Sequence, residues 1–249
     1  MASIVERLAA LLGAGGRAVL FTVVEGEHAG EKLLVVEGGE TLGDGPRELA
    51  DFAYEILRGG RNRLLEHNGA RVFAEWYGPP PRLLVYGAVD TAEALCAAAR
   101  LLGWRTIVAD ARARFATHER IPSADELLVA WPDGALAQVR PDHQTAVVVL
   151  THDDKFDVPA LVGALATEAF YIGALGSRRN QERRRERLLE AGAAESDLER
   201  ISGPCGLDIG ADTQEETAVS ILGEILAVRA ARDGGMLRRS GQRIHAEVE

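Results

Sequence analysis

Short apolar runs alternate with helix-length stretches from residue 83 onward, and this alternation constrains the fold more than any other feature. The runs at 83–87, 106–110, 126–130, 146–151 and 169–174 are predicted strands. The stretches at 91–102, 158–167, 178–191 and 214–232 are predicted helices. Parallel strands need long crossover connections, which place helices on both faces of the sheet. The sequence therefore predicts an α/β fold with a covered parallel sheet.

A proline run divides this part of the chain from a smaller one before it. Pro79, Pro80 and Pro81 follow Gly78, and consecutive prolines favour a stiff extended spacer. Before it, apolar runs at 18–24, 32–36, 63–66 and 71–76 surround an amphipathic run at 46–57, which indicates a small α+β unit. We therefore expect an N-terminal α+β domain at 1–78, a linker at 79–82, a parallel-sheet domain at 83–233 and a charged tail at 234–249.

Composition narrows the class of protein. The formal net charge is -10, with 38 acidic against 28 basic side chains, which makes nucleic acid an unexpected partner. The two cysteines, Cys96 and Cys205, are too few and too unevenly spaced for a disulfide framework or a CxxC metal site. Residues 1–17 resemble a short amphipathic helix, and no run reaches the roughly 18 apolar residues of a membrane span. A cytoplasmic protein without a membrane span or a metal site is the expectation.

The first strand of the larger domain ends where a dinucleotide fingerprint would lie. Gly87 permits a tight turn, Ala92 is a tolerated third position, and Asp110 ends the second strand, where an acidic residue can bind a ribose. Val89 occupies the position of the second glycine, and its branched side chain disfavours the usual pyrophosphate pose. Two plainer interpretations remain open. The turn can be a connection without a ligand, and Asp110 can simply cap the turn that follows it.

Ligands of open α/β sheets collect beyond the carboxyl ends of the strands, so the next segments are candidate binding loops. The fourth strand leads into His152 and Asp153, which could orient a polar ring or move a proton. Against this, Asp157 is a plausible N-cap for the following helix, and Lys155 can neutralise its neighbours.

The fifth strand leads into an anion-binding sequence. Gly176, Ser177, Arg178 and Arg179 place a flexible turn, a hydroxyl and two guanidinium groups at the start of a helix, where backbone amides and the helix dipole also favour a phosphate. The plainer alternative is that Ser177 only caps the helix and the arginines only solvate it. The arginines that follow, at 183–187, alternate with glutamates and are interpreted as a water-facing ion-pair surface.

A third segment precedes the last helix. Asp208 lies in a glycine-rich stretch that lets backbone amides approach a bound group. Thr213, with Glu216 three residues later, forms a capping box that starts the helix. Cys205 could carry sulfur or ligate a metal, but a single thiol without local partners is more often inert. Cys96 lies on the apolar side of the first helix and is expected in the core.

Three phrases carry a resemblance to a known family: THDDKFDVPAL, YIGALGSRRNQERRRERL and GLDIGADTQEETAVSILGEILA. In this order, behind a strand-glycine-helix start, they resemble the C-terminal Rossmann-like domain of the XdhC/CoxI family over about 150 residues. The family consists of accessory proteins for xanthine dehydrogenase and carbon monoxide dehydrogenase. The resemblance implies a non-catalytic chaperone that binds the molybdenum cofactor (molybdopterin, in its plain or dinucleotide form), assists its sulfuration and delivers it to a molybdenum hydroxylase apoenzyme.

The resemblance also implies a set of cofactor-binding residues and further partners. The residues that would surround the cofactor are Gly87, Asp110, His152, Asp153, Gly176, Ser177, Arg178, Arg179, Asp208 and Thr213. A cysteine desulfurase is a further candidate partner, and a homodimer is one assembly that the two-domain layout leaves open.

The chain departs from the family pattern in two places. Val89 stands in the turn where members commonly have Gly-x-Gly. In the N-terminal domain, residues 27–30 and 43–46 stand where the family usually has Ser-Ser-Pro-Arg and Gly-Gly-Cys, and this chain has no cysteine there.

Two alternatives compete with the chaperone. An NAD(P)-dependent oxidoreductase would use Asp110 to hold the ribose and His152 to move a proton. A third candidate is a protein that only docks to the hydroxylase or to a sulfurtransferase and binds no cofactor.

Overall fold

The computed structural model describes residues 3–151 and 153–241, and the chain forms two compact units. The first holds the described residues up to Pro79 together with those from Met236 onward, and the second is Pro80–Gly235. Within the described residues, no helix combines the length and the apolar character needed to cross a bilayer. His152 lies outside the described residues.

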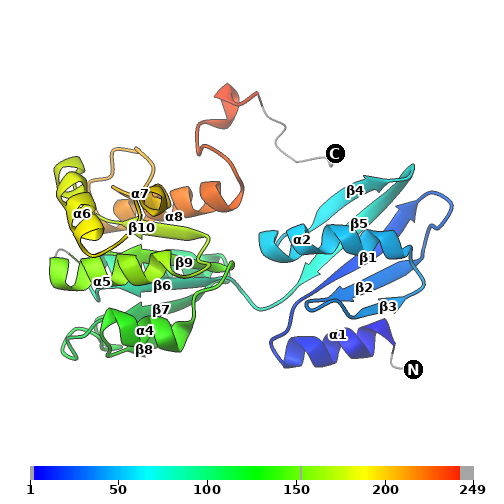
Figure 1. The fold of residues 1–249 in the computed structure, drawn as a ribbon, viewed down its shortest axis with the longest axis horizontal. Coiled ribbons are helices and arrows are strands. Elements are labelled where there is room, and N and C mark those ends of the chain that lie inside the picture. Colours follow the sequence, from blue (N-terminus) through cyan, green and yellow to red (C-terminus); the bar gives the residue numbers. More distant parts are fainter. Residues whose placement is uncertain (1–2, 152, 242–249) are drawn as a thin grey trace. The chain divides into compact units, whose positions relative to one another are not determined.

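The second unit is built on a six-stranded sheet whose neighbouring strands all pair in parallel (Figure 1). In chain order its elements are β6 (Arg82–Tyr86), α3 (Asp90–Leu101), β7 (Arg105–Ala109), β8 (Glu126–Leu128), α4 (Pro132–Val139), β9 (Thr145–Val149), α5 (Asp154–Leu165), β10 (Tyr171–Ala174), α6 (Arg178–Glu190), α7 (Glu195–Leu198), β11 (Ile201–Ser202) and α8 (Gln214–Arg229). The strand order is β11-β10-β9-β6-β7-β8. Counted from β6 as the first strand, this is the order 3-2-1-4-5-6 of a Rossmann fold, which confirms the predicted fold class.

Alternating side chains of the strands fill two apolar cores, one on each face of the sheet. Leu83 and Val85 point to the core shared with α3 and α8. Leu84 and Tyr86 point to the core shared with α4 and α5. Because side chains of a strand alternate between the two faces, a strand buried on both sides is apolar at every position.

The predicted helices and strands of this unit lie close to those observed, with three omissions and one error. The helices α4 and α7 and the strand β11 were not predicted. The α4 sequence begins Pro132-Asp133-Gly134, which also favours a turn, but proline suits the first position of a helix. The prediction that Asp157 caps α5 is wrong: Asp153 is the N-cap and accepts a hydrogen bond from the Lys155 amide, while Asp157 is buried within the helix.

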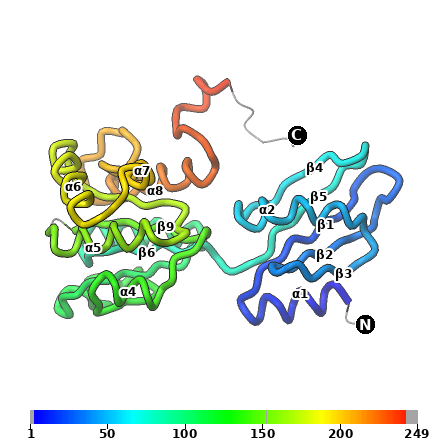
Figure 2. Tube along the Cα trace, in the orientation of Figure 1, coloured from blue at the N-terminus to red at the C-terminus, as the bar shows by residue number. Residues whose placement is uncertain are grey.

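The first unit is a five-stranded antiparallel sheet, β3-β2-β1-β5-β4, with helices on both faces (Figure 2). Its elements are α1 (Ile4–Gly13), β1 (Ala18–Glu25), β2 (Lys32–Val36), β3 (Thr41–Gly43), a short 3₁₀ helix (Arg47–Phe52), α2 (Ala53–Gly59), β4 (Arg63–His67) and β5 (Ala70–Tyr77). Val19 and Phe21 pack in the core with α2, whereas Ala18 and Leu20 face α1. The unit is thus the α+β fold that the sequence indicated.

Candidate functional site

The strand order of the second unit reverses between β6 and β9, and a cavity of about 340 Å³ lies at the carboxyl ends of these strands. In open α/β folds this switch point is where ligands bind. Apolar side chains and polar groups share the cavity wall. The lining residues are Val89, Asp90, Thr91, Leu150, Leu175, Gln214 and Thr217.

Two helix starts meet at this cavity. Val89 is the N-cap of α3 and makes no side-chain cap, so the first amides of α3 are left for other partners. The Thr91 hydroxyl donates a hydrogen bond to the side-chain carbonyl of Gln214 at the start of α8. The cavity therefore offers amides, an amide side chain, hydroxyls and the Asp90 carboxylate above an apolar floor of Leu150 and Leu175.

Gly87 lets the ends of β6 and β9 approach each other closely. Its φ is +101°, and an added Cβ would lie 2.7 Å from Cγ2 and 3.2 Å from the amide nitrogen of Thr151. Only glycine meets both conditions without strain. The predicted tight turn is present, and its glycine serves the packing of two strands as well as the turn itself.

Asp110 is buried at the end of β7 and is occupied by groups of its own chain. Its carboxylate accepts hydrogen bonds from the Ala88 amide (3.0 Å) and from Nε and Nη2 of Arg112 (2.9 and 2.8 Å). It also accepts a hydrogen bond from the Arg112 amide, so Asp110 caps the turn that follows β7. Burial by itself would raise the pKa of Asp110, but the hydrogen bonds from Arg112 and Ala88 outweigh it and lower the pKa. The carboxylate is thus ionised and paired, with little surface left for a ribose.

The α4–α5 side of the same edge is closed. Gly87 and Asp110 line a slot there of only about 10 Å³, together with Thr151 and Phe156. The Phe156 ring is buried and packs against Trp131 at 5.0 Å between ring centroids. A ligand larger than a water molecule therefore has room on the α3–α8 side and not on this one.

The start of α6 carries the charge expected of an anion site. Ser177 is the N-cap and accepts a hydrogen bond from the Asn180 amide, and Gly176 has a φ of +143°. Arg178 and Arg179 are exposed, and neither makes an ion pair within the described part of the chain. The neighbouring Leu175 lines the cavity.

A comparison of the helices that begin at this edge singles out α6. The first turns of α3, α4, α5 and α8 each contain at least one acidic residue, but that of α6 contains none. Carboxylates already satisfy the positive dipole ends of the other helices. The α6 dipole is accompanied by two arginines instead, so an oxyanion is best stabilised there.

The remaining predicted residues have local roles in the structure. Asp153 caps α5, and its side chain lies 3.8 Å from Nζ of Lys155. Asp208 is exposed. Thr213 forms the predicted capping box with Glu216, whose carboxylate accepts the Asp212 and Thr213 amides. These contacts order the loops around the cavity without placing Asp153, Asp208 or Thr213 on its wall.

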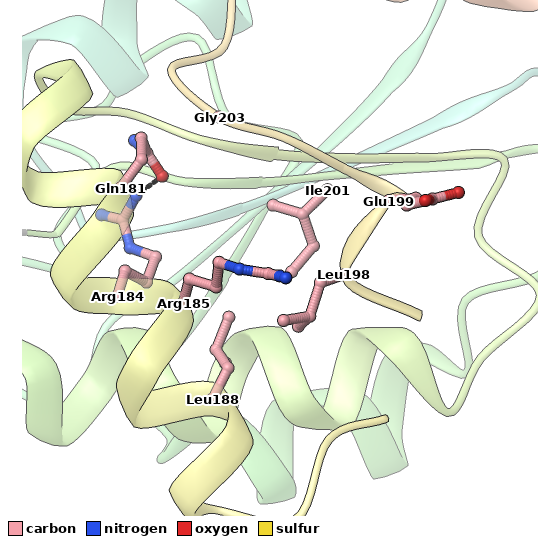
Figure 3. Close-up of a pocket in the computed structure, with 8 residues that line it drawn as sticks. All are labelled: Gln181, Arg184, Arg185, Leu188, Leu198, Glu199, Ile201 and Gly203. Carbon is pink, nitrogen blue, oxygen red and sulfur yellow. Dashed lines mark hydrogen bonds between the residues drawn. The ribbon is translucent and has the colours of Figure 1, made fainter. Parts of the chain in front are cut away.

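Arg184 corrects the interpretation of α6 as a wholly water-facing ion-pair surface. It is buried, and its Nη2 lies 3.0 Å from Oδ2 of Asp157 and 2.9 Å from the Leu175 carbonyl oxygen. Its Nη1 donates to Oε1 of Gln181 at 2.6 Å (Figure 3). Asp157 also accepts a hydrogen bond from the Thr151 hydroxyl. This network ties the segments that follow β9 and β10 to α5 and to the middle of α6.

A second cavity, of about 210 Å³, lies beside α6, between it and the segment from Leu198 to Gly203 (Figure 3). Arg185 extends over Leu188, Leu198 and Ile201, which form its apolar wall. None of the described residues predicted for the site lines this cavity.

Cys205 lies in the apolar core beneath α8 and is 8% exposed. Burial raises the pKa of its thiol to about 12, and the nearby Glu224 carboxylate acts in the same direction. The thiol is therefore protonated at neutral pH, which disfavours a nucleophilic or sulfur-carrying role. Cys96 is fully buried in the core, as expected.

None of the seven residues that line the main cavity was among the predicted site residues, and only Val89 was discussed, as an obstacle to a pyrophosphate. Polar residues beyond each strand were favoured as candidates, whereas the floor of this cavity is apolar. The positions of Leu150 and Leu175 directly after two strands could have marked them as cavity residues. No local pattern in the sequence predicts that α8 approaches α3, because this contact depends on packing between segments that are far apart in the chain.

Comparisons with known proteins agree with this fold. Residues 83–225 match the model of the XdhC Rossmann domain. The chain is 30% identical over 234 residues to the uncharacterized protein YqeB of Escherichia coli, covering 85% of this chain and 42% of that protein. It is 34% identical over 158 residues to a protein of Bacillus subtilis named as a probable xanthine dehydrogenase component, covering 64% of this chain and 46% of that protein.

Two further matches extend the comparison. The molybdenum cofactor insertion chaperone PaoD of Escherichia coli is 30% identical over 157 residues, covering 63% of this chain and 43% of PaoD. The matches thus span less than half the length of these curated relatives. A crystal structure described as a xanthine dehydrogenase from Bacillus halodurans has the same fold, with a TM-score of 0.67 at 24% identity, covering 95% of this chain and 66% of that one.

The family match covers more than half of the chain, and it begins at β6 and ends within α8. It therefore includes every strand of the parallel sheet and the cavity at its switch point. The chain belongs to the XdhC family, and its second unit is an XdhC Rossmann domain.

Proposed function

We propose that this protein binds the molybdenum cofactor, assists its maturation, including sulfuration, and delivers it to a molybdenum hydroxylase such as xanthine or carbon monoxide dehydrogenase. The observation that carries the proposal is the start of α6, where Arg178 and Arg179 lie in a first turn without acidic residues, shortly after Leu175, which lines the cavity at the switch point. The names of the relatives from Escherichia coli and Bacillus subtilis agree with such a role.

The residues present fit the organic part of this cofactor. Its phosphate matches the amides and guanidinium groups at the start of α6. Its pterin ring is flat and polar at the edges, which suits a cavity with an apolar floor and with Thr91, Gln214 and Thr217 on its walls. The bound cofactor supplies the metal centre that the recipient enzyme uses. The chain itself would hold the phosphate, orient the ring and limit access of water.

An NAD(P)-dependent oxidoreductase is the weaker candidate. The carboxylate of Asp110 is engaged by Arg112 and by the Ala88 amide, so it is not available to a ribose without displacing them. Val89 lines the cavity at the position where a dinucleotide fingerprint has its second glycine.

The partners that we propose follow from this role. They are the apoenzyme of a molybdenum hydroxylase and a cysteine desulfurase, which would supply sulfur from outside because both cysteines of this chain are buried. A cytoplasmic location and a homodimer belong to the same proposal and are tested by fractionation and by light scattering.

The proposal is tested by co-expressing the chain with a cofactor-producing pathway. The purified protein is oxidised, and the fluorescence of the released pterin is measured. We expect retained pterin in the wild type and about tenfold or greater loss in Arg178→Gln/Arg179→Gln, because two charge-assisted contacts with phosphate are removed.

The matched control is Arg238→Gln/Arg239→Gln, which removes the same charge from another exposed arginine pair. This control should retain wild-type pterin. Unchanged retention in the Arg178/Arg179 variant would remove α6 from the site. Absence of pterin from the wild type, after co-expression and anaerobic purification, would argue against cofactor binding altogether.

A further inference from the structure

We infer that Asp90 and Gln214 determine the ligand specificity of the cavity at the switch point, by forming hydrogen bonds with the 2-amino-4-oxo edge of a pterin ring. The inference rests on the proposed function and deepens it, because it assigns the polar edge of the ring to the starts of α3 and α8. The phosphate is then left to the start of α6, beyond Leu175.

Asp90 brings a carboxylate to the wall of the cavity. It is the first residue of α3, and its side chain is 84% exposed. The guanidinium group of Arg120 lies 3.6 Å away, and within residues 3–151 and 153–241 this carboxylate has no other ion pair or hydrogen bond. A carboxylate offers acceptor oxygens only, so Asp90 favours a ligand that presents N–H donors.

Gln214 brings hydrogen-bond donors to the same wall. Its side-chain carbonyl accepts a hydrogen bond from the Thr91 hydroxyl, and Thr91 is only 4% exposed, so this contact is shielded from water. The contact orients the side-chain amide, whose Nε2 meets no acceptor among the described residues. Two N–H donors therefore remain for a carbonyl group of a ligand.

The two groups lie on one wall although they come from distant parts of the chain. Asp90 directly precedes Thr91, whose hydroxyl contacts Gln214, 123 positions further on. The wall between α3 and α8 thus presents acceptors beside donors. The 2-amino-4-oxo edge of a pterin has the complementary order, with an amino group and a ring N–H that donate and a carbonyl oxygen that accepts. The apolar floor of the cavity suits the faces of the same ring.

The charges around the cavity orient such a ligand. Asp90 disfavours a phosphate at the starts of α3 and α8, where Glu215 and Glu216 add further negative charge. The first turn of α6 contains no acidic residue and holds Arg178 and Arg179. An anionic ligand with a donor-rich ring is therefore bound with its ring edge towards Asp90 and its phosphate towards α6.

The test compares two rings that differ only at the edge in question. Pterin carries a 2-amino group, and lumazine carries an oxo group in its place. The full chain, freed of pterin, is titrated with each compound, and binding is followed through the fluorescence of the ring. We expect the wild type to bind pterin about tenfold more tightly than lumazine, because the 2-oxo group of lumazine faces the Asp90 carboxylate without a hydrogen bond.

Asp90→Asn exchanges one acceptor oxygen for an amino donor with almost no change of shape. It should weaken pterin binding about tenfold and strengthen lumazine binding, because the new amino group can donate to the 2-oxo group. The preference for pterin should therefore be lost. The matched control is Asp133→Asn, an exposed carboxylate in the first turn of α4 that does not line this cavity, and it should keep the wild-type preference.

Gln214→Glu removes the donors and keeps an acceptor for the Thr91 hydroxyl. Both rings carry the 4-oxo group, so both affinities should fall about fivefold to tenfold while their ratio stays unchanged. The matched control is Gln138→Glu, an exposed glutamine of α4 that does not line the cavity and should leave both affinities unchanged.

Any of four results would overturn the inference. These are no binding of either ring by the wild type, equal affinities for the two rings, a wild-type preference in Asp90→Asn, or wild-type affinities in Gln214→Glu. Retention of pterin after co-expression is measured separately, through the arginine pair of α6, and it can persist in each case. Failure of this assignment is therefore distinguishable from failure of the proposed function.

Discussion

Gly87 occupies a position where both the backbone and the surroundings exclude a side chain. Its φ of +101° disfavours other residues, and Thr151 leaves no room for a Cβ. Gly103 has a similar positive φ of +72° but has open space around it. We therefore expect Gly87→Ala to lower the free energy of unfolding by about 2–4 kcal/mol, and Gly103→Ala by about 1 kcal/mol.

Urea unfolding monitored by circular dichroism measures both losses. Because both glycines have a positive φ but only Gly87 has close neighbours, the difference between the two losses measures the clash of the added Cβ with Thr151. Equal losses would mean that the approach of β6 to β9 does not depend on the missing side chain.

The two buried cysteines predict how stability changes at high pH. Burial raises the pKa of both Cys96 and Cys205 to about 12 in the folded protein. An unfolded cysteine titrates near 8.5, so above about that pH the unfolded chain loses protons that the folded chain keeps. Stability is therefore complete below about pH 8.5 and falls as pH rises towards 12.

The free energy of unfolding, measured at about pH 8, 9.5 and 11, should decrease along this series. Buried tyrosines contribute in the same direction, so the diagnostic comparison is with Cys205→Ala. This variant should show a shallower decrease than the wild type, by up to about 1.4 kcal/mol per pH unit. An identical slope would contradict the burial of the Cys205 thiol.

At the scale of elements, the network around Arg184 joins the middle of α6 to α5 and to the segments that follow two strands. Arg184 and Asp157 are both buried. Asp157 accepts a hydrogen bond from the Thr151 hydroxyl, and Arg184 donates one to the Leu175 carbonyl oxygen. Removal of one charge leaves the other buried without its partner, which typically costs about 3–5 kcal/mol. We expect Arg184→Met to reduce the free energy of unfolding by this amount.

The next arginine along the helix is the matched control. Arg183 is exposed and lies 3.8 Å from Asp154, so Arg183→Met should change stability by less than about 1 kcal/mol. The double variant Arg184→Met/Asp157→Leu should recover much of the loss, because no buried charge remains. A loss in Arg184→Met as small as that of the control would contradict a buried ion pair.

At the scale of the whole molecule, the two units have separate sheets and separate cores. We propose that the boundary at 79–82 is a domain linker and that the second unit folds by itself. A fragment of residues 80–235 should show cooperative urea unfolding and the circular dichroism of a mixed α/β protein.

The control is a fragment that begins at residue 88. It lacks β6, the strand that pairs with both β7 and β9, and it should not fold cooperatively. Aggregation of the longer fragment, or a broad transition without a folded baseline, would mean that the second unit needs the first.

The sequence by itself determined the fold class and most of the elements, with α4, α7 and β11 among the exceptions. Strands such as β9, in which all five residues are buried, are recognisable because a two-sided sheet requires apolar side chains at every position. The capping box of Thr213 and Glu216 and the cap at Ser177 were predictable because they depend on residues three positions apart. Local spacing suffices for such features.

Only the tertiary structure decided which chemical groups meet. The switch point brings Val89 and Leu150 to one cavity with Gln214 of α8, and it buries Arg184 against Asp157, 27 positions away. It also brings the Ala88 amide to the carboxylate of Asp110, 22 positions away. The pattern of charges on one segment cannot show which faces another segment will cover, because burial and pairing arise from contacts between residues far apart in the chain.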